Sequence, residues 1–579
     1  MADPLREPGF VTLDQLNAVG ADGNIFLTAC PGSGKTRTAG VRLARLDDEG
    51  YRVAACSYTN TGVEQIRRAL AEDLRRPLGA EHFVGTLHSF LLTYVVYPFG
   101  YLRTDSTKGH RIVMDDREWP RIPVTSDGKL PPQPLSAFCF RADGEIVFRS
   151  SARLSVDPEQ AVIVGGSKAR QRKLSFAQAG MLSADDAMYI ALRVLRKHPD
   201  LAVAVASRFD ELLVDEAQDT SELQLACLAA LYDTGELRSL VLIGDLEQSI
   251  CSFNGADRQG CAALAAHCGL TELPLRENHR SSQLICNTAS FFCEREPDVA
   301  VGLHATIDWS PELLFYARGH ARDAVGKFHQ RLTELGIEPE NSTVLARANS
   351  LVDQLNGGLA SLTIVPAAET LGYAVAALRG QRTIARREVE RVDRLVADTA
   401  WGLGHGVIDP STRWQVRRAT MDVLDAAPSL ELGLQDWISA AREPFAAAVS
   451  RLVDEPARKI SSILKTSSKH AGHTALAVFA PETSPLRART IHDVKGESVD
   501  AALVVASPGH GQRSADADVW SLLLAGREPA EDEAEELRVV FVALTRARRY
   551  VALALVENTS ADIVSRFRAA GFQLRDAGV

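Results

Sequence analysis

One short segment constrains the fold of this 579-residue chain more than any other. Asn24 to Thr28 predict a short buried strand, and Thr36 to Leu46 predict a helix. Between them lies ACPGSGKT, residues 29–36, which fits the P-loop pattern except that Ala29 replaces the first glycine. Glycines let successive backbone N–H groups turn inward and hold phosphate oxygens, and the helix N-terminus adds the positive end of its dipole. The segment therefore predicts an α/β domain that binds a nucleoside triphosphate.

A second segment, RFDELLVDEAQD, contributes two neighbouring acids. Its apolar run Leu212–Val214 predicts a strand, and ligands of parallel α/β sheets collect at the carboxyl ends of the strands. We expect Asp215 and Thr36 to hold Mg²⁺, and Glu216 to polarise the attacking water. Together with the P-loop, the acid pair predicts hydrolysis of the bound nucleotide.

The P-loop and the sequence DEAQD at residues 215–219 closely resemble motifs of superfamily-one helicases of the UvrD/Rep/PcrA type. The family's other motifs have similar segments in the same order along this chain. These are the Q motif at Leu13–Gln15, motif Ia at Cys56–Asn60, motif Ib at Gly85–Phe90, motif III at Gly244–Ala256 and motif IV at Leu275–Ser281. The strand region after motif IV corresponds to Val344–Asn349, motif V to Thr490–Asp500 and motif VI to Glu535–Arg548. The resemblance implies an α/β fold with two RecA-like P-loop NTPase domains, whose parallel sheets each carry a mostly helical insertion. It also implies ATP and Mg²⁺ as cofactors.

The resemblance assigns roles to residues of the nucleotide site. Arg280 and Arg546 are similar to two arginine fingers that approach the γ-phosphate, and their planar fork suits a charge-spread transition state. Surface ion pairs are the structural alternative for both. Gln248 resembles the γ-phosphate sensor, Gln15 the residue that reads the adenine edge, and His279 stands where many relatives have a Tyr that stacks on adenine. The other expected nucleotide contacts are Ala29, Cys30, Pro31, Gly32, Ser33, Gly34, Lys35, Thr36, Arg37 and Glu497.

The resemblance also predicts single-stranded DNA, or its junction with duplex, as the partner. The predicted DNA contacts are Tyr58, Thr59, Asn60, Thr86, His88, Phe253 and His492. Tyr58 and Phe253 occupy positions where the family places aromatic rings under bases, with core packing as the alternative. Thr86, His88 and His492 lie where relatives touch phosphates, and a structural role is the alternative for the two histidines. No long hairpin for splitting a duplex is recognisable near the end of the chain, so translocation is predicted more firmly than unwinding.

The motifs also delimit domains. The first motor domain is expected over residues 1–95 and 200–275, the second over 276–370 and 479–579, and the insertions over 96–199 and 371–478. In the first insertion, Phe138–Arg149 predicts a hairpin that turns at Asp143-Gly144, and Ala184–Lys197 predicts a helix capped by Ser183. A basic cluster in the same insertion is a candidate phosphate contact, with a solvated loop as the equal alternative: Lys168, Arg170, Arg172 and Lys173.

Composition narrows the alternatives. The net charge of −10 does not exclude nucleic-acid binding, which depends on local basic surface. No apolar run is long enough to span a bilayer, and the N-terminus lacks the apolar core of a secretion signal, so we expect a cytoplasmic protein without a membrane partner. The nine cysteines suit reduced thiols better than disulfides. A metal site is the less favoured interpretation of four of them, because zinc ligands usually lie closer together in sequence: Cys261, Cys268, Cys286 and Cys293.

Two functions stay open at this point. The first is an ATP-dependent translocase or helicase in DNA repair, recombination or mobile-element metabolism, with 3′→5′ polarity taken from the family. The second is a DNA-sensing ATPase subunit that regulates a partner nuclease, because ACPGSGKT, HDVKGES and the compact insertions are similar to helicase-like subunits of Gabija-type antiphage defence systems. An inactive scaffold is disfavoured because all six candidate catalytic residues are present: Lys35, Asp215, Glu216, Gln248, Arg280 and Arg546.

Overall fold

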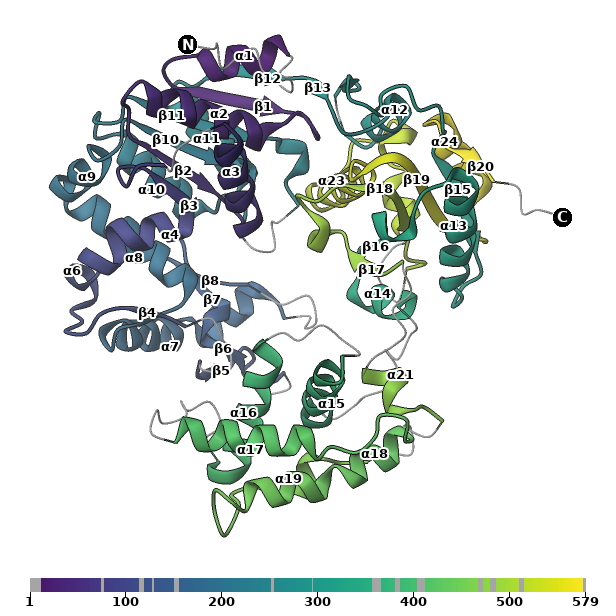
Figure 1. The fold of residues 1–579 in the computed structure, drawn as a ribbon. Helices are drawn as coiled ribbons and strands as arrows, with labels where there is room; N and C mark the ends of the chain where they lie inside the picture. Colours follow the sequence, from purple (N-terminus) through teal and green to yellow (C-terminus); the bar gives the residue numbers. More distant parts are fainter. Residues whose placement is uncertain are drawn as a thin grey trace. The chain divides into compact units, whose positions relative to one another are not determined.

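The computed structural model divides the chain into two compact units, Met1–Arg318 with Thr490–Val579, and Gly319–Arg489 (Figure 1). It describes residues 12–73, 78–113, 119–127, 130–149, 156–250, 255–293, 295–356, 366–380, 386–402, 412–466, 472–479, 486–509 and 515–575. The predicted domain boundaries stay a prediction. Phe253 lies outside the described residues.

The first unit contains a six-stranded sheet in the order β12-β1-β11-β10-β2-β3, and every strand pair in it is parallel. Its strands are β1 (Ile25–Ala29), β2 (Val53–Ser57), β3 (Phe83–Thr86), β10 (Glu211–Asp215), β11 (Ser239–Gly244) and β12 (Thr271–Leu275). Both strands that the sequence predicted are confirmed, in β1 and β10. Because all strands run the same way, the residues that follow β1, β10 and β11 come together at one edge.

Helices cover both faces of this sheet, because alternate strand residues point to opposite sides. On one face, Leu213 and Val241 pack with Ala39 of α2. On the other, Leu212 and Leu242 belong to a cluster that includes the helices after β10. The helices around this sheet are α1 (Leu13–Gly20), α2 (Lys35–Asp48), α3 (Asn60–Asp73), α10 (Glu222–Tyr232) and α11 (Arg258–His267). The predicted helix Thr36–Leu46 lies within α2.

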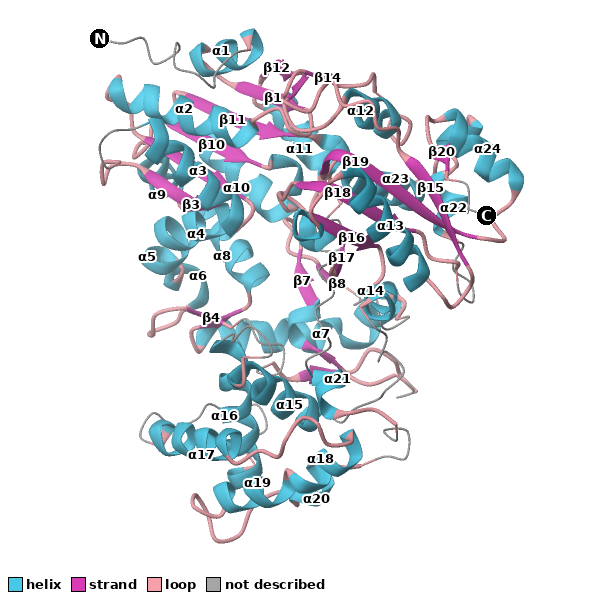
Figure 2. Cartoon of the chain, turned by 45° about the vertical axis from the view of Figure 1, so that its right-hand side comes forward, coloured by secondary structure: helices cyan, strands magenta, loops and turns pink. Residues whose placement is uncertain are grey.

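A second set of strands in the same unit pairs in the order β18-β19-β15-β20, also in parallel (Figure 2). These strands are β15 (Glu312–Tyr316), β18 (Val499–Val505), β19 (Ala547–Val556) and β20 (Gln573–Leu574), accompanied by α12 (Gln283–Ser290), α22 (Asp516–Trp520), α23 (Glu531–Leu544) and α24 (Ala561–Ala569). A two-stranded parallel ladder pairs β13 (Glu277–Asn278), which precedes α12, with β14 (Val299–Ala300), which follows it. The predicted α/β class with parallel sheets is confirmed.

The segment between β3 and β10 is mostly helical. Its elements are α4 (Leu87–Leu91), η2 (Leu92–Val96), α5 (Tyr97–Phe99), α6 (Tyr101–Thr104), β4 (Arg111–Ile112), β5 (Arg121–Ile122), β6 (Gln133–Pro134), η4 (Leu135–Ala137), β7 (Phe138–Phe140), β8 (Ile146–Phe148), α7 (Pro158–Gln178), β9 (Met181–Leu182), α8 (Ala184–Lys197) and α9 (Pro199–Ala206). The predicted hairpin is β7 and β8, which pair antiparallel, and Gly144 takes the positive φ that its turn requires. The predicted helix is α8, and the Ser183 hydroxyl accepts its capping bond from Asp186 N.

The predicted basic cluster lies on α7 rather than in a loop. Lys173 is buried, and its Nζ donates to both carboxylate oxygens of Asp186 at 2.7 and 2.9 Å. This buried pair corrects the expectation that Lys173 faces phosphates. Lys168, Arg170 and Arg172 are exposed.

The second unit contains the strand β16 (Ser342–Ala346), the first two residues of β17 (Ala488–Thr490), two helices next to β16 in sequence and a helical region. The two helices are α13 (Arg322–Leu335) and α14 (Asn349–Leu355). The helical region comprises α15 (Pro366–Leu378), α16 (Arg386–Trp401), α17 (Arg413–Asp425), α18 (Leu434–Ala440), α19 (Arg442–Val449), α20 (Ile460–Ile463) and α21 (Ala475–Phe479). Its apolar core includes Trp437, Phe445 and Phe479. Across the described part of the chain, no helix combines the length and apolarity that crossing a membrane demands.

Candidate nucleotide and DNA site

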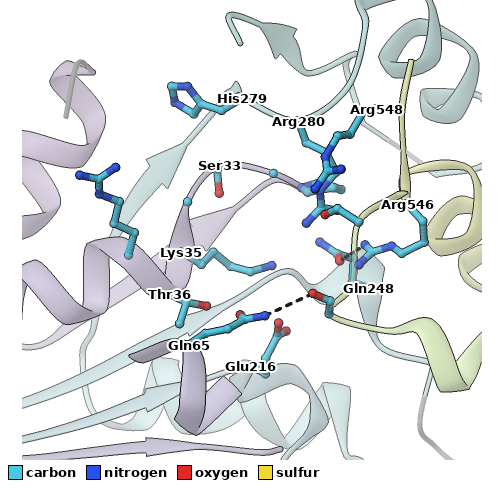
Figure 3. Close-up of a pocket in the computed structure, with 16 residues that line it drawn as sticks. Ser33, Lys35, Thr36, Gln65, Glu216, Gln248, His279, Arg280, Arg546 and Arg548 are labelled. Atoms are coloured by element: carbon cyan, nitrogen blue, oxygen red, sulfur yellow. Dashed lines mark hydrogen bonds between the residues drawn. The ribbon is translucent and has the colours of Figure 1, made fainter. Parts of the chain in front are cut away.

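A cavity of about 350 Å³ opens at the carboxyl ends of the first sheet's strands (Figure 3). Twelve predicted residues line it: Pro31, Gly32, Ser33, Gly34, Lys35, Thr36, Arg37, Glu216, Gln248, His279, Arg280 and Arg546. Four residues that were not predicted also line it: Gln65, Gly496, Ser498 and Arg548. All belong to the first unit. The cavity thus brings together segments that are more than 500 residues apart in sequence.

The P-loop has the backbone that its glycines permit. Gly32 and Gly34 have φ values of 75° and 78°, and Gly34 immediately precedes α2. A Cβ on Gly32 would lie 2.5 Å from Arg280 Cβ, so this position also lacks space for a side chain. The His279 N–H donates to the Gly32 carbonyl at 3.0 Å. The loop is therefore fixed against the segment that carries Arg280, with the N-terminus of α2 directed into the cavity.

The two expected Mg²⁺ ligands are in contact, because Thr36 Oγ1 donates to Asp215 Oδ2 at 3.0 Å. A hydroxyl and a carboxylate are oxygen ligands of the kind that Mg²⁺ prefers. Burial and the neighbouring Glu216 charge raise the pKa of Asp215. Burial alone would raise the pKa of Glu216, but Lys35 and Lys495 lower it overall, so this carboxyl stays ionised.

Glu216 has a strained backbone, with φ of 55° in the left-handed region that non-glycine residues rarely adopt. Such strain costs about 1–3 kcal/mol and persists only where the surroundings fix it. Here the Glu216 N–H donates to Asp215 Oδ1 at 3.0 Å, and Gln218 Nε2 donates to Glu216 Oε2 at 2.5 Å. The strained turn holds one acid at the end of β10 and directs the next one into the cavity.

Two arginines, the buried Arg546 and the half-buried Arg280, line the cavity with Glu216. Arg280 Nη1 donates to the Thr545 carbonyl at 2.9 Å, and Arg546 Nη2 donates to Gln248 Oε1 at 2.9 Å. Burial first, and then the charge of Arg546, lower the pKa of Arg280 to about 9. Burial lowers the pKa of Arg546 to about 10, against the raising effect of Glu216. Buried cations held by neutral oxygens are costly, so the site favours an anion between these side chains.

Gln15 and His279, both predicted to contact adenine, bond to the backbone of the P-loop. Gln15 Nε2 donates to the Ser33 carbonyl at 2.9 Å, while its buried Oε1 has no hydrogen-bond partner among the described residues. His279 lines the cavity, and its buried Nε2 likewise lacks one within the described ranges. An acceptor and a ring nitrogen of this kind could hold the polar edge of a base. Glu497 contributes its carbonyl, which accepts from Arg546 Nη1 at 3.3 Å.

The residues that sequence reasoning missed lie outside the strongest part of each motif. Gln65 is on α3, and its Nε2 donates to the Gly496 carbonyl at 3.5 Å. Arg548 follows Arg546 by two residues and pairs with Asp500 at 3.1 Å. Its position two residues after a predicted finger was the sequence signal that could have found it.

Five of the seven predicted DNA contacts lie at the ends of β2 and β3 or just after them, and these strands are neighbours in the sheet. Tyr58 is half-buried, and Thr59 and Asn60 are exposed at the start of α3. The Thr86 hydroxyl caps α4 by accepting from Ser89 N at 3.0 Å. His88 is half-buried, and burial lowers its pKa, although the charge of Asp185 has the opposite effect.

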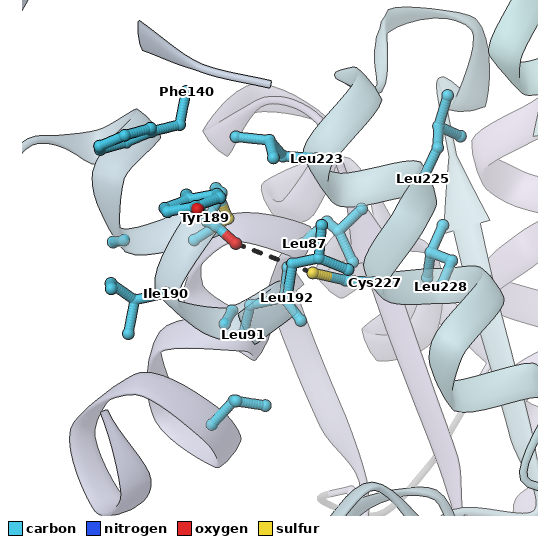
Figure 4. Close-up of a cluster of buried hydrophobic side chains, with 14 of the residues drawn as sticks. Leu87, Leu91, Phe140, Tyr189, Ile190, Leu192, Leu223, Leu225, Cys227 and Leu228 are labelled. Carbon is cyan, nitrogen blue, oxygen red and sulfur yellow. Dashed lines mark hydrogen bonds between the residues drawn. The ribbon is translucent and has the colours of Figure 1, made fainter. Parts of the chain in front are cut away.

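The helix that carries His88 is anchored in an apolar cluster. Leu87 and Leu91 of α4 pack there with residues of α8 and α10, including Tyr189 and Cys227 (Figure 4). The ring of Tyr189 stacks on Phe140 of the predicted hairpin, with centroids 4.3 Å apart. The first insertion thus shares a continuous core with the helices of the first sheet.

His492, the last predicted phosphate contact that the structure describes, donates from Nε2 to the Ile250 carbonyl at 3.0 Å. Ile250 belongs to the motif III segment, Gly244–Ala256, so this bond joins that segment to motif V. The DNA role of His492 stays a prediction.

Other candidate ligand groups have structural explanations. Among the described residues, the ligand atoms of Asp47, Glu81 and His82 lie within 4.8 Å of one another. His82 Nδ1 accepts from Val53 N at 3.2 Å, so Nε2 carries the proton and donates to Asp47 at 2.9 Å. Both ring nitrogens are therefore used. Burial raises the pKa to about 12 for the four cysteines considered as metal ligands, Cys261, Cys268, Cys286 and Cys293.

Comparison with known proteins adds independent support. Residues 11–105 and 159–268 match the family model of the UvrD/REP helicase N-terminal domain. The ATP-dependent DNA helicase SRS2 of Saccharomyces cerevisiae is 27% identical over 310 residues, 46% of this chain and 25% of that protein. The ATP-dependent DNA helicase PcrA of Leuconostoc citreum is 23% identical over 286 residues, and that of Staphylococcus aureus 25% over 285, covering 37% and 38% of those proteins and 46% of this chain. This chain therefore aligns with less than two fifths of each relative. The predicted resemblance to UvrD-like helicases is confirmed over the N-terminal domain, which contains the P-loop, both acids and Gln248.

Proposed function

We propose that this protein is an ATP-dependent motor that moves along single-stranded DNA in the manner of a UvrD-like helicase. One observation carries this proposal: Lys35 and Glu216, from the first sheet, line the same cavity as Arg280 and Arg546, which adjoin the second. A nucleotide in this cavity would touch both parts of the molecule, so its hydrolysis could change how they are held together. The likeness to proteins named ATP-dependent DNA helicases supports both the nucleotide and the DNA.

The cavity residues suit phosphoryl transfer to water. Lys35 and the N-terminus of α2 would bind the β- and γ-phosphates. Thr36 and Asp215 would hold Mg²⁺, which neutralises phosphate charge when bound. Glu216, kept ionised by its cationic neighbours, would accept the proton of the attacking water. Arg280 and Arg546 would stabilise the charge that spreads over the transferring group.

The hydrogen bond between Arg546 and Gln248 suggests how ATP hydrolysis is coupled to DNA binding. Gln248 Oε1 accepts from Arg546 Nη2 at 2.9 Å. A γ-phosphate is a charged and therefore stronger acceptor, so it would compete for this guanidinium. Gln248 shortly precedes Phe253, the predicted base-stacking residue. We infer that the two nucleotide states differ in which group bonds to Gln248, and that hydrolysis affects DNA binding through this residue of motif III. The 3′→5′ polarity follows from the family resemblance.

The first experiment measures steady-state ATP hydrolysis with and without single-stranded DNA or RNA. We expect strong stimulation by DNA, and loss of turnover in Lys35→Ala and in the near-isosteric Glu216→Gln, with unchanged circular dichroism. Arg68→Ala is the matched control, because Arg68 lies on α3, is 75% exposed and pairs with Glu64 only at 3.7 Å. Normal hydrolysis by Lys35→Ala would refute the assignment of the site.

A second experiment separates a motor from a regulatory subunit. Movement is followed by displacement of a dye or protein block from the end of a single strand, and unwinding by release of a labelled complement. Block displacement that requires ATP supports the motor. DNA-stimulated hydrolysis without displacement, together with co-purification of an endonuclease, would instead favour the antiphage regulatory subunit.

A further inference from the structure

We propose that Arg295, a residue outside every recognised motif, is a positioning residue that fixes the direction of the Gln248 amide and thereby the resting position of Arg546. This inference rests on the proposed function and names a control element of the same site. Arg295 lies in the segment that joins α12 to β14. Nothing in the sequence around it resembles a nucleotide-binding motif.

Arg295 is fixed by three partners that are themselves buried. Its Nη1 lies 3.2 Å from both carboxylate oxygens of Asp245, and its Nη2 donates to Asp298 Oδ2 at 3.1 Å. The guanidinium also lies 4.9 Å from the ring centroid of Phe541. The exposed fractions are 4% for the Asp245 side chain and 11% for that of Asp298, and Phe541 is 1% exposed. Two carboxylates and one ring face leave the guanidinium plane almost no freedom.

One route leads from Arg295 to Arg546 through Asp245 and Gln248. Asp245 Oδ2 accepts from Gln248 Nε2 at 2.7 Å, and Gln248 Oε1 accepts from Arg546 Nη2 at 2.9 Å. A carboxylate only accepts hydrogen bonds and a guanidinium only donates them, so the Gln248 amide has a single possible orientation between them. Arg295 Nη1 bonds to both oxygens of the same carboxylate, so it fixes the position of the group that accepts from the amide nitrogen.

A second route leads from Arg295 to Arg280. The Phe541 carbonyl accepts from Thr545 N, and the Thr545 carbonyl accepts from Arg280 Nη1 at 2.9 Å. The Phe541 ring is the one on which the guanidinium of Arg295 lies. Arg295 therefore contacts Asp245, which leads to Arg546, and Phe541, which leads to Arg280.

Asp245 also connects this cluster to the acid that is expected to activate water. Its N–H donates to Gln218 Oε1 at 3.1 Å, and Gln218 Nε2 donates to Glu216. If a γ-phosphate replaces Gln248 as the acceptor for Arg546, Asp245 still accepts a hydrogen bond from the Gln248 amide nitrogen. The amide oxygen is then free to face the phosphate or water instead of rotating away. An ordinary structural ion pair would not make this demand on the direction of one amide.

The test compares Arg295→Lys, which keeps the charge but loses the planar fork, with Arg295→Met, which loses both. We expect Arg295→Lys to lower kcat about tenfold, as for loss of one charge-assisted hydrogen bond, with KM for ATP nearly unchanged. Arg295→Met should lower kcat further. Arg258→Lys is the matched control, because Arg258 pairs at 2.6 Å with Glu247, in the same short turn as Gln248 but outside the cavity. It should behave as the unchanged protein.

A double-variant cycle separates positioning from a general structural role. If Arg295 acts through Gln248, Arg295→Lys should have almost no further effect on kcat in a Gln248→Ala background. Equal fold-losses in both backgrounds, or a rise in KM with kcat unchanged, would overturn the role of Arg295 and leave the proposed function intact. Absence of ATP hydrolysis by the unchanged protein would reject the two together. Should Arg295→Met fail to fold, Arg295→Lys alone still decides, because it retains the cation beside both carboxylates.

Discussion

Replacement of Lys495 by Met should loosen the end of β10 where the two acids lie. Lys495 follows η10 (His492–Val494), and its Nζ donates to Asp219 at 2.7 and 2.5 Å and to the Gln248 carbonyl at 2.8 Å. The exposed fraction is 12% for the Lys495 side chain and 1% for that of Asp219. Methionine is similar in length but carries no charge, so Asp219 would stay buried without its cation.

The size of the effect follows from this burial. Removing one partner of a buried ion pair costs about 3–5 kcal/mol, because the remaining charge stays desolvated. Burial already raises the pKa of Asp219 and Lys495 opposes it, so without Lys495 this carboxyl can bind a proton instead of staying charged. We therefore expect a cost near the lower end, about 3 kcal/mol, which corresponds to roughly a hundredfold faster local opening.

Hydrogen–deuterium exchange with mass spectrometry measures this opening directly. Peptides that cover residues 211–220 and 245–250 should exchange faster in Lys495→Met, whereas a peptide from α8 should not. In the double variant Lys495→Met with Asp219→Asn, protection should return to within about 1 kcal/mol of the unchanged protein, because no buried charge is left. Unchanged exchange in the single variant, or an equal loss in the double variant, would refute the reasoning.

Two more predictions follow from single buried groups. Burial raises the pKa of Asp298 from 3.8 to about 6, because its effect is larger than the opposing effect of the Arg295 charge. The protonated carboxyl is therefore favoured in the folded state. Its contribution to stability is complete below pH 3.8, the pKa in the unfolded chain, and is lost as the pH rises through about 6. Asp298→Asn should remove roughly 3 kcal/mol of this pH-dependent change, seen as a flatter dependence of the unfolding midpoint between pH 4 and 7; an unaltered slope would contradict the assignment. Because the buried Gln15 Oε1 can accept from an adenine amino group, Gln15→Ala should raise KM for ATP about tenfold and narrow the preference for ATP over GTP. Equal ATP and GTP constants in the unchanged protein would show that Gln15 does not read the base.

Features set by neighbouring residues were predictable from the sequence. The strand, glycine loop and helix around Lys35 follow from local periodicity and from glycines that adopt positive φ, and Ser183 caps α8 as its position suggests. The basic cluster shows where local composition fails. Lys168 and Lys173 look equivalent in sequence, but the helical period turns one outward and buries the other against Asp186. A charge count cannot distinguish these two outcomes.

The bonds that organise the cavity depend on pairs of residues brought together only by the fold. Arg546 and Gln248 are 298 positions apart, and Arg295 has no local pattern at all. The charge balance of the cavity nevertheless has a simple consequence. The half-buried Arg280 and the buried Arg546 bond to neutral oxygens, and desolvation, the largest cause, lowers the pKa of each. A polyanion placed between them and Lys35 would remove that cost on both sides of the cavity at once. Nucleotide binding would thus stabilise the contact between the loops of the two sheets. Loss of the terminal phosphate would return Arg546 to Gln248 and Arg280 to the Thr545 carbonyl. A motor requires a change of this kind to couple hydrolysis to movement along DNA.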